Sequence, residues 1–258
     1  MSSSFLERIT AARRADAEAR AASLGDVKHA AGSAGPARDF RGALVRPGLA
    51  LIAEIKRASP SAGLIAPGAD RLAIARAYEA GGAAAVSVLT EPDHFGGSLE
   101  DLRAVRASIA LPVLRKDFIA HPLQVWEARA AGADAVLLIV AALEQRDLVA
   151  LLDLAETTGM AALVEAHTAP EMARAVDAGA RIVGINTRDL ATLHVDPRKV
   201  AELRDRVPDG VTTVGESGIR TRADVEAMDA AGVDAVLVGE TLMRADDPAA
   251  KIRELLGA

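Results

Sequence analysis

A chain of 258 residues that is 50% hydrophobic and 26% charged has ample material for one large core, and we expect it to be globular. Its formal net charge of -6 argues against a general nucleic-acid-binding protein, because such proteins carry a basic stripe that neutralises phosphates. The absence of cysteine excludes disulfides and a thiol nucleophile, and no apolar run approaches the ~20 residues of a membrane span.

The N-terminal segment is predicted to be a helical extension. Residues 1–20 mix acidic and basic side chains and lack the apolar core of a signal peptide, so we expect a cytoplasmic protein. From Phe5 to about Ala31, one helical face carries Phe5, Leu6, Ile9 and Ala12. The stretch Gly32–Gly48 predicts a connecting loop. We expect residues 1–48 to lie across one rim of the domain that follows or against its helices, and to help close its active site.

Eight short, nearly all-apolar segments follow in the rest of the chain: Leu49–Lys56, Ala84–Thr90, Pro112–Asp117, Ala135–Val140, Ala161–Ala166, Ile182–Thr187, Thr212–Ser217 and Ala235–Glu240. Continuous apolar runs are typical of strands buried on both faces, as in parallel sheets covered by helices. Stretches of helical apolar spacing separate them, and their starts lie ~21 to 35 residues apart, the length of a βα unit. The pattern predicts an α/β protein, a single (β/α)8 TIM barrel domain over residues 1–258 with an N-terminal helical extension.

Turn and cap signals mark the boundaries of these units. A short alanine-glycine phrase precedes four of the strands, at Ala80-Gly81-Gly82, Ala131-Gly132, Ala178-Gly179 and Ala231-Gly232. Each phrase predicts a helix that ends at a left-handed glycine and returns quickly to the next strand. Thr221 and Asp224 resemble a capping box that opens the seventh helix.

Ionisable or hydroxyl side chains end six of the eight segments, and in a barrel they converge on the C-terminal rim, where active sites lie. On the first strand Glu54 and Lys56 are two residues apart and therefore face the same side, although alone they could equally form a structural ion pair. The candidates on later strands are Lys116, Glu165, Asn186, Arg188, Glu216 and Ser217. Lysines and carboxylates at close quarters perturb one another's pKa, which favours general acid and base catalysis near neutrality.

Three loops at the same rim predict a phosphate site. Glycines at Ser217-Gly218 after the seventh strand and at Gly239-Glu240 after the eighth allow backbone N–H groups to face an anion. Ser59, after the first strand, adds a hydroxyl. Each glycine alone is compatible with an ordinary tight turn, but the three strands are neighbours in a closed barrel. We therefore expect a phosphorylated small molecule as the partner.

The sequence offers no metal or cofactor signature. The five histidines, His29, His94, His121, His167 and His194, lack the spacing of metal ligands, and we interpret them as solvated. No strand is followed by a glycine-rich dinucleotide fingerprint. We expect side chains alone to perform the chemistry, without a metal or cofactor.

Motifs at the strand ends occur in order along nearly the whole chain: Ile52–Ser61, Ser87–Glu91, Phe95–Ser98, Leu114–Phe118, Leu163–Glu165, Gly184–Leu190 and Gly215–Ile219. Together they closely resemble the signature of the indole-3-glycerol phosphate synthase family. The resemblance implies a tryptophan-pathway enzyme whose substrate is 1-(2-carboxyphenylamino)-1-deoxyribulose 5-phosphate and whose products are indole-3-glycerol phosphate, CO2 and water. Departures are mild: lysine is common where this chain has Ala62, and asparagine where it has Thr187.

The resemblance also implies roles for individual residues. Lys116 would be the general acid and Glu165 the general base. Lys56 would orient the substrate carboxylate and could donate a proton, with Glu54 setting its charge and position. The other rim residues would bind substrate: Asn186 and Glu216 its polar groups, Arg188 its carboxylate, and Ser59, Ser217, Gly218, Gly239 and the backbone N–H of Glu240 its phosphate.

Three alternatives remain open from the sequence. A sister barrel of the pathway, phosphoribosylanthranilate isomerase, needs a Cys and Asp pair, and this chain has no Cys. A Schiff-base aldolase would use Lys116 as its nucleophile. A non-catalytic barrel that binds only a phosphosugar or a protein should have lost the polar rim that this chain keeps. For the oligomeric state we expect a monomer or a weak homo-oligomer.

Overall fold

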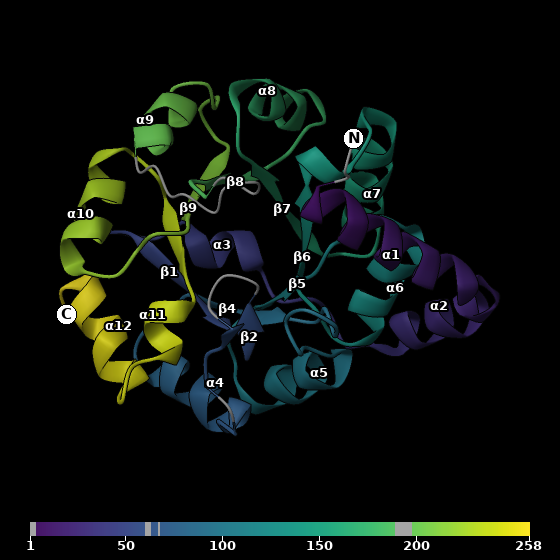
Figure 1. Cartoon of the computed structure of the whole chain (residues 1–258), viewed down its shortest axis with the longest axis horizontal. Helices are drawn as coiled ribbons and strands as arrows, with labels where there is room; N and C mark the ends of the chain where they lie inside the picture. The colour runs from purple at the N-terminus through teal and green to yellow at the C-terminus, as the bar shows by residue number, and fades with distance from the viewer. Residues whose placement is uncertain (1–3, 60–62, 67, 189–197) are drawn as a thin grey trace.

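The computed structural model describes residues 4–59, 63–66, 68–188 and 198–258, and within them eight parallel strands form a closed barrel (Figure 1). The barrel strands are β1 (Ala50–Ile55), β4 (Ala85–Leu89), β5 (Val113–Lys116), β6 (Ala135–Ile139), β7 (Ala161–Ala166), β8 (Ile182–Asn186), β9 (Thr212–Glu216) and β10 (Ala235–Val238). Strand β10 pairs with both β9 and β1, so the loops after β1, β9 and β10 are neighbours. The prediction of a TIM barrel is confirmed.

Helices follow the strands and surround the barrel: α4 (Arg71–Ala80), α5 (Leu99–Ser108), α6 (Pro122–Ala130), α7 (Gln145–Thr157), α8 (Ala169–Asp177), α9 (Arg198–Arg204), α10 (Arg222–Ala230), α11 (Glu240–Met243) and α12 (Pro248–Leu256). A two-stranded hairpin, β2 (Ala58–Ser59) and β3 (Gly63–Leu64), lies in the loop after β1, and a 3-10 turn, η2 (Val140–Ala142), follows β6. None of the helices in the described part of the chain is long and apolar enough to cross a membrane.

Local sequence signals explain where these elements begin and end. The glycines that follow α4, α6, α8 and α10 have positive φ angles between 78° and 91°, at Gly82, Gly132, Gly179 and Gly232. Such angles favour glycine because it lacks a Cβ. At the start of α10, the Thr221 side chain accepts from the N–H of Asp224 while the Asp224 side chain accepts from the N–H of Thr221. Both the glycine turns and the capping box confirm the predictions.

Burial on both faces of the strands explains their continuous apolar character. All six residues of β1 are buried. Alternate side chains, such as Leu51 and Ala53, join the core between the strands and the outer helices. The intervening ones, such as Ile52, join a second core inside the barrel, together with Leu114 and Leu163. Apolar side chains fill most of the barrel interior, which leaves the strand ends as the place for a polar site.

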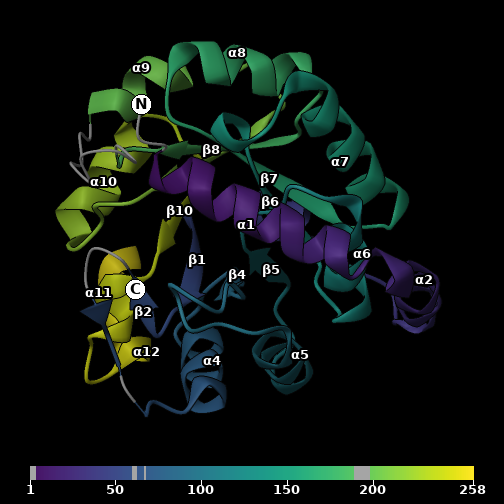
Figure 2. The ribbon, with the colours of Figure 1, turned by 45° about the vertical axis from the view of Figure 1, so that its right-hand side comes forward.

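The N-terminal extension divides into parts that reach different sides of the barrel. Helix α1 (Phe5–Ala19) crosses the C-terminal side of the barrel in front of β5 to β7 (Figure 2). After the 3-10 turn η1 (Ala21–Ser23), α2 (Leu24–Ser33) packs against α6. Helix α3 (Phe40–Leu44) is visible through the barrel in Figure 1 and closes its opposite end, where Phe40 and Leu44 join the interior core.

Two expectations about the extension are wrong in detail. Gly32–Gly48 is not a plain loop, because α2 continues to Ser33 and α3 lies within it. A five-residue helix has little periodicity to detect, and α3 forms because its two apolar side chains cover the N-terminal end of the barrel. Ala12 is exposed, whereas its neighbour Arg13 faces the barrel.

Ion pairs attach α1 to the rim. The Arg13 guanidinium donates from Nε to Oδ1 of Asp117 at 3.0 Å and from Nη2 to Oδ2 at 2.8 Å. Arg14 pairs with Asp147 at 3.2 Å, and Arg20 pairs with Glu127. The bidentate pair is geometrically specific. It places the middle of α1, at Arg13, over Asp117, the residue that follows Lys116.

Candidate active site

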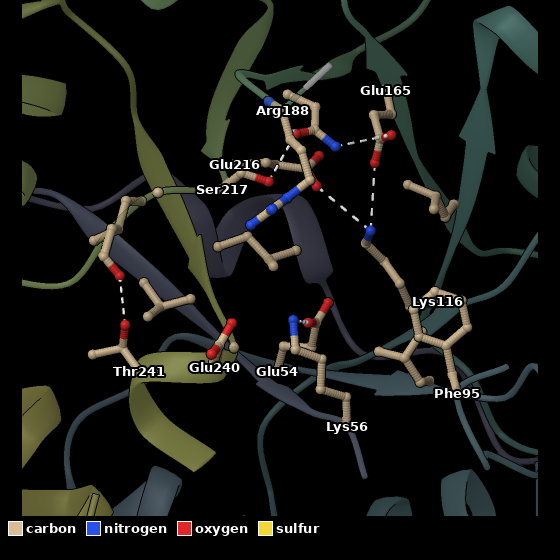
Figure 3. Close-up of a pocket in the computed structure, with 18 of the residues that line it drawn as sticks. Glu54, Lys56, Phe95, Lys116, Glu165, Arg188, Glu216, Ser217, Glu240 and Thr241 are labelled. Carbon is tan, nitrogen blue, oxygen red and sulfur yellow. Dashed lines mark hydrogen bonds and ion pairs between the residues drawn. The ribbon is translucent and has the colours of Figure 1, made fainter. Parts of the chain in front are cut away.

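A pocket of about 1330 Å³ opens at the C-terminal ends of the strands. The predicted site residues that line it are Glu54, Lys56, Lys116, Glu165, Asn186, Arg188, Glu216, Ser217, Gly218, Gly239 and Glu240. Figure 3 shows how the labelled side chains among them point toward one centre. Ser59 is the exception, because only its backbone, in β2, is described. Other residues named from the sequence, Ser61, Ala62, Leu190 and His194, lie outside the described residues.

Lys116, at the end of β5, lies between two carboxylates (Figure 3). Its Nζ is 3.4 Å from Oε2 of Glu165 and 3.6 Å from Oε2 of Glu216. Burial by itself lowers the pKa of Lys116, but the charges of Glu165 and Glu54, joined by that of Glu216 once it ionises, outweigh burial and raise that pKa above its ordinary value. Lys116 is therefore an ammonium at neutral pH, as a proton donor must be.

Glu165, near the end of β7, is held as a carboxylate. Its Oε1 accepts from Nδ2 of Asn186 at 3.2 Å. The amide of Asn186 is fixed in this orientation because its Oδ1 accepts from Ser217 Oγ at 2.8 Å and from the Arg188 N–H at 3.0 Å. Burial raises the pKa of Glu165, but Lys116, His167 and Asn186 outweigh burial and lower that pKa below its ordinary value. Glu165 can therefore accept a proton.

Glu54 and Lys56 of the first strand form an ion pair at the pocket wall, with Lys56 Nζ 3.0 Å from Oε1 of Glu54. Burial raises the pKa of Glu54, but Lys56 and Lys116 outweigh burial and lower it. A Cβ at Gly239 would collide with Oε1 of Glu54 and lie 3.1 Å from Lys56 Nζ. Glycine at the end of β10 therefore leaves the space that this pair occupies.

Glu216, at the end of β9, differs from the other two buried carboxylates. Burial and the nearby charge of Glu165 raise the pKa of Glu216 to about 8, although Lys116 opposes the shift. A Cβ at Gly184 of β8 would collide with Oε1 of Glu216, so that glycine makes room for the carboxyl group. Glu216 therefore holds a proton at neutral pH beside an ionised Glu165.

Replacing Glu216 by glutamine is expected to stabilise the protein increasingly as the pH rises. The folded-state pKa of Glu216 lies above its ordinary value of 4.5, so the native state binds a proton that the unfolded state releases. The contribution of Glu216 to the free energy of unfolding therefore falls between pH 4.5 and about 8 in the natural protein, and glutamine removes this loss. At pH 8 we expect the variant to be more stable by at least ~1 kcal/mol.

Urea unfolding of the natural protein and of Glu216→Gln at pH 5, 6, 7 and 8 measures this difference. The exposed Glu202→Gln change in α9 is the matched control, for which the difference should stay small at every pH. A Glu216→Gln difference that did not grow with pH would contradict the raised pKa.

The loops after β9 and β10 meet at one side of the pocket. Ser217 has a φ of 71°, a left-handed angle that is rare outside glycine, and Gly218 follows at 80°. Thr241 Oγ1 donates to the carbonyl of Ile219 at 2.7 Å and joins the two loops (Figure 3). The short helix α11 starts at Glu240. The glycine-containing loops expected at this side of the pocket are therefore present. Ser217 adopts a strained left-handed conformation there, and the hydrogen bond of Thr241 connects the two loops.

The interpretation of all histidines as solvated is wrong for His167, which is only 7% exposed. Its Nε2 lies 3.3 Å from Oε1 of Glu165. The sequence contained a signal for this placement. Glu165 and His167 are two residues apart at a strand end and therefore face the same side, as Glu54 and Lys56 do. Of the other histidines, His121 caps α6, and His94 contacts the Phe5 ring edge-on.

The apolar part of the pocket lining, called the apolar wall below, was also missed. It consists of Phe5, Leu6, Leu89, Phe95, Phe118, Leu137, Ile139, Leu237 and Val238, which come from α1 and from several strands of the barrel and the loops that follow them. The chain has four phenylalanines, and three of them are on this wall. The ring centroids of Phe95 and Phe118 are 6.0 Å apart. Such a wall suits an aromatic ring, and the scarcity of phenylalanine elsewhere was the available signal.

A metal centre finds no support in the geometry. Across the described ranges, no three His, Cys, Asp or Glu side chains are grouped so that they could hold a metal ion. The clustered carboxylates contact lysine, histidine and asparagine instead.

Solved structures with a similar fold include 3-hexulose-6-phosphate synthase, with a TM-score of 0.64 and 19% identity over 81% of this chain and 99% of that one. Another is thiamine phosphate pyrophosphorylase from Pyrococcus furiosus, with a TM-score of 0.62 and 16% identity over 84% of this chain and 96% of that one. At these identities the likeness concerns the barrel fold alone.

Sequence comparisons are more specific. The family model for indole-3-glycerol phosphate synthase matches residues 6–255. The indole-3-glycerol phosphate synthase of Mycobacterium avium (strain 104) is 53% identical over 255 residues, which cover 98% of this chain and 94% of that protein. The enzyme of the same name from Mycobacterium tuberculosis (strain H37Rv) is 52% identical over the same shares of each chain. The chain therefore belongs to the indole-3-glycerol phosphate synthase family.

Proposed function

We propose that this rim closes the indole ring with Lys116 as general acid and Glu165 as general base. Family membership makes the chain a carboxy-lyase of tryptophan biosynthesis. The substrate is 1-(2-carboxyphenylamino)-1-deoxyribulose 5-phosphate, and the products are indole-3-glycerol phosphate, CO2 and water. The observation that carries the assignment is the 3.4 Å separation between the Lys116 ammonium and the Glu165 carboxylate, inside a pocket with one apolar wall.

Ring closure begins at the ketone of the ribulosyl chain. The aromatic carbon that bears the carboxylate attacks the ketone carbon, a carbon–carbon bond forms, and the ketone oxygen takes a proton from Lys116. The carbon–carboxylate bond then breaks, CO2 leaves, and its electron pair restores the aromatic ring. An ammonium already positioned in a water-poor site stabilises the developing oxyanion without reorganisation.

Dehydration completes the indole. The new hydroxyl leaves as water after it takes a proton, while a base removes the proton from the neighbouring carbon and the double bond forms. Glu165 is ionised and close to Lys116, so acid and base face the same part of the substrate. Lys56, paired with Glu54, is the second ammonium of the pocket and can serve either the carboxylate or the leaving hydroxyl.

The remaining residues position the substrate. Arg188, beside Asn186, would face the anthranilate carboxylate, and the protonated Glu216 would donate to a polar group of the sugar. The loops after β9 and β10 would bind the phosphate through backbone N–H groups of Ser217, Gly218, Gly239 and Glu240, which line the pocket. The family resemblance adds the Ser59 hydroxyl from the loop after β1. The phenyl ring would rest on the apolar wall.

A Schiff-base mechanism through Lys116 is disfavoured by the same geometry. An imine forms from a neutral amine, and the carboxylates around Lys116 raise its pKa and keep it charged. Borohydride added with substrate should therefore trap no covalent adduct.

The activity test mixes purified protein with the carboxyphenylamino-deoxyribulose phosphate and follows indole fluorescence. Glu165→Gln is expected to lower kcat by ~10²- to 10⁴-fold, because the amide cannot accept the proton released during dehydration. KM should change little, since glutamine keeps the size of the side chain and one acceptor oxygen. The surface change Glu202→Gln should leave both constants as they are.

The outcomes separate the two parts of the proposal. Near-normal turnover by folded Glu165→Gln would remove Glu165 from the role of base. No fluorescence from the folded natural protein would contradict ring closure itself.

A further inference from the structure

His167 occupies an unusual place for a histidine that the reaction does not need directly. It follows the last residue of β7 and precedes Thr168, the N-cap of α8. Its side chain is buried and lies behind Glu165 rather than among the residues that line the pocket. A buried imidazole in this position demands partners for both ring nitrogens.

Both ring nitrogens face carboxylates. Nε2 is 3.3 Å from Oε1 of Glu165, and Nδ1 is 3.3 Å from Oε2 of Glu171, in the first turn of α8. The backbone N–H of His167 donates to the same Glu171 oxygen at 2.8 Å, and Thr168 Oγ1 donates to the other at 3.0 Å. Glu171 is therefore fixed by three donors, and the imidazole is fixed against Glu171.

The charge state follows from this arrangement. A neutral imidazole has one N–H for the two carboxylates, whereas an imidazolium has an N–H toward each. The Nδ1 contact with Glu171 is a hydrogen bond, and the Nε2 contact with Glu165 is an ion pair that lacks hydrogen-bond geometry. Burial lowers the pKa of His167, but its contacts with Glu165 and Glu171 outweigh burial and raise that pKa to about 10. Beyond Glu165, the charged or titratable groups are Lys116 from β5 and Glu216 from β9.

The contacts of Glu165 divide between its two oxygens. Oε1 meets Asn186 Nδ2 and His167 Nε2, whereas Oε2 faces the Lys116 ammonium. An oxygen that accepts from Asn186 and lies beside the charge of His167 is a weaker base than one that faces only the reacting centre. The Glu165 carboxylate also rotates less freely because its Oε1 is held by Asn186 and His167.

We infer that His167 is a positioning residue for Glu165: as an imidazolium braced by Glu171, it holds Oε1 so that Oε2 is the oxygen presented to Lys116 and the substrate. The inference rests on the proposed role of Glu165 as the base. His167 itself touches no reacting atom, and it acts through the orientation and the charge of the carboxylate in front of it.

Kinetics of two substitutions separate a hydrogen bond from a charge. His167→Gln keeps a donor but loses the positive charge, and we expect kcat to fall ~10-fold with KM within ~3-fold of its natural value. His167→Leu loses both, and we expect kcat to fall ~10²-fold. The control is His121→Asn, which replaces one helix cap with another outside the pocket and should leave both constants unchanged. Natural kcat in both His167 variants would overturn the inference.

A titration of the imidazole tests the same contact without relying on activity. The nitrogen NMR signals of His167 are assigned by their loss in His167→Gln, and their chemical shifts report the charge of the ring. In the natural protein we expect an imidazolium throughout pH 6 to 8. In Glu165→Gln and in Glu171→Gln, the midpoint should fall by at least ~1 pH unit, because each loses one carboxylate partner.

The titration also separates this inference from the proposed function. A midpoint near the ordinary value of 6.5, or one that ignores both glutamine substitutions, would overturn the positioning role even in an active enzyme. If instead Glu165→Gln retained turnover while the His167 midpoint shifted as expected, the contact would be real, but the base would be another group and the positioning role would fall with it.

Discussion

Replacing Lys116 by alanine is expected to lower kcat for ring closure by ~10³-fold or more. The substitution removes the proton donor at the ketone oxygen. It also leaves the ionised Glu54 and Glu165 in the same pocket without the ammonium that neutralises them. The pKa of Glu165 would rise toward neutrality, so the base would weaken together with the loss of the acid.

A second variant distinguishes proton transfer from charge. Lys116→Arg keeps a positive charge near Glu165 but does not release a proton at neutral pH, because an arginine side chain stays protonated in proteins. We expect its kcat to remain at least ~10²-fold below that of the natural protein. Turnover restored to the natural level by arginine would mean that Lys116 acts through charge alone.

The measurement is single-turnover indole fluorescence with saturating enzyme, which isolates the chemical step from substrate binding. Lys251→Ala in α12 is the matched control, because Lys251 pairs with the exposed Glu254 and lies outside the pocket. It should leave kcat unchanged. Near-normal kcat in a folded Lys116→Ala protein would remove Lys116 from the role of acid.

Replacing Asp117 by alanine is expected to have the largest effect on stability, lowering the free energy of unfolding by ~3–5 kcal/mol. Asp117 accepts from Arg115 Nη2 at 2.8 Å, from Thr90 Oγ1 at 2.7 Å and from the Arg13 guanidinium. Arg115 is only 1% exposed, and its other carboxylate, Glu127, is 3.7 Å away. The substitution would leave the buried guanidinium of Arg115 without its nearest carboxylate. It would also remove the ion pair with Arg13 that attaches α1 to the rim.

The contribution of Asp117 should depend on pH in a defined direction. Burial raises the pKa of Asp117, but Arg115 and Arg13 outweigh burial and lower it to about 2, below the ordinary value of 3.8. The stabilisation is therefore complete above pH 3.8 and is lost as the pH falls toward about 2. Asp117→Asn, which keeps the shape but not the charge, should approach the stability of the natural protein over that range.

Urea unfolding at neutral and acidic pH measures both effects. The control is Asp147→Asn, which breaks the partly exposed pair with Arg14 and should cost less than ~1 kcal/mol. A loss of less than ~1 kcal/mol in Asp117→Ala would contradict a structural role for this cluster.

Many site residues could be predicted because a parallel barrel orders them by sequence position. Lys116, Glu165 and Glu216 each end an apolar run, and the closed barrel brings those ends into one pocket. The pair Glu54 and Lys56 followed from the two-residue period of a strand. The same rule applied to Glu165 and His167 would have found the buried histidine, which residue type alone suggested was solvated.

Other features depended on contacts between distant segments. Nothing in the sequence near Arg13 indicates that its partner is Asp117, 104 residues away. The helix Phe40–Leu44 is too short to show a helical pattern in the sequence. It forms because its apolar side chains cover the N-terminal end of the barrel. The left-handed Ser217 shows no glycine signal and is held by its hydrogen bond to Asn186.

By itself the sequence determined the barrel, the rim on which the chemistry lies and the family, because strands buried on both faces and motifs at their ends are local patterns that survive in one dimension. Only the tertiary structure decided which carboxylates are ionised, how Asn186 and His167 hold Glu165, and where α1 and α3 close the barrel. Those properties are set by burial and by charges a few ångströms apart in space, and neither quantity is a function of separation along the chain.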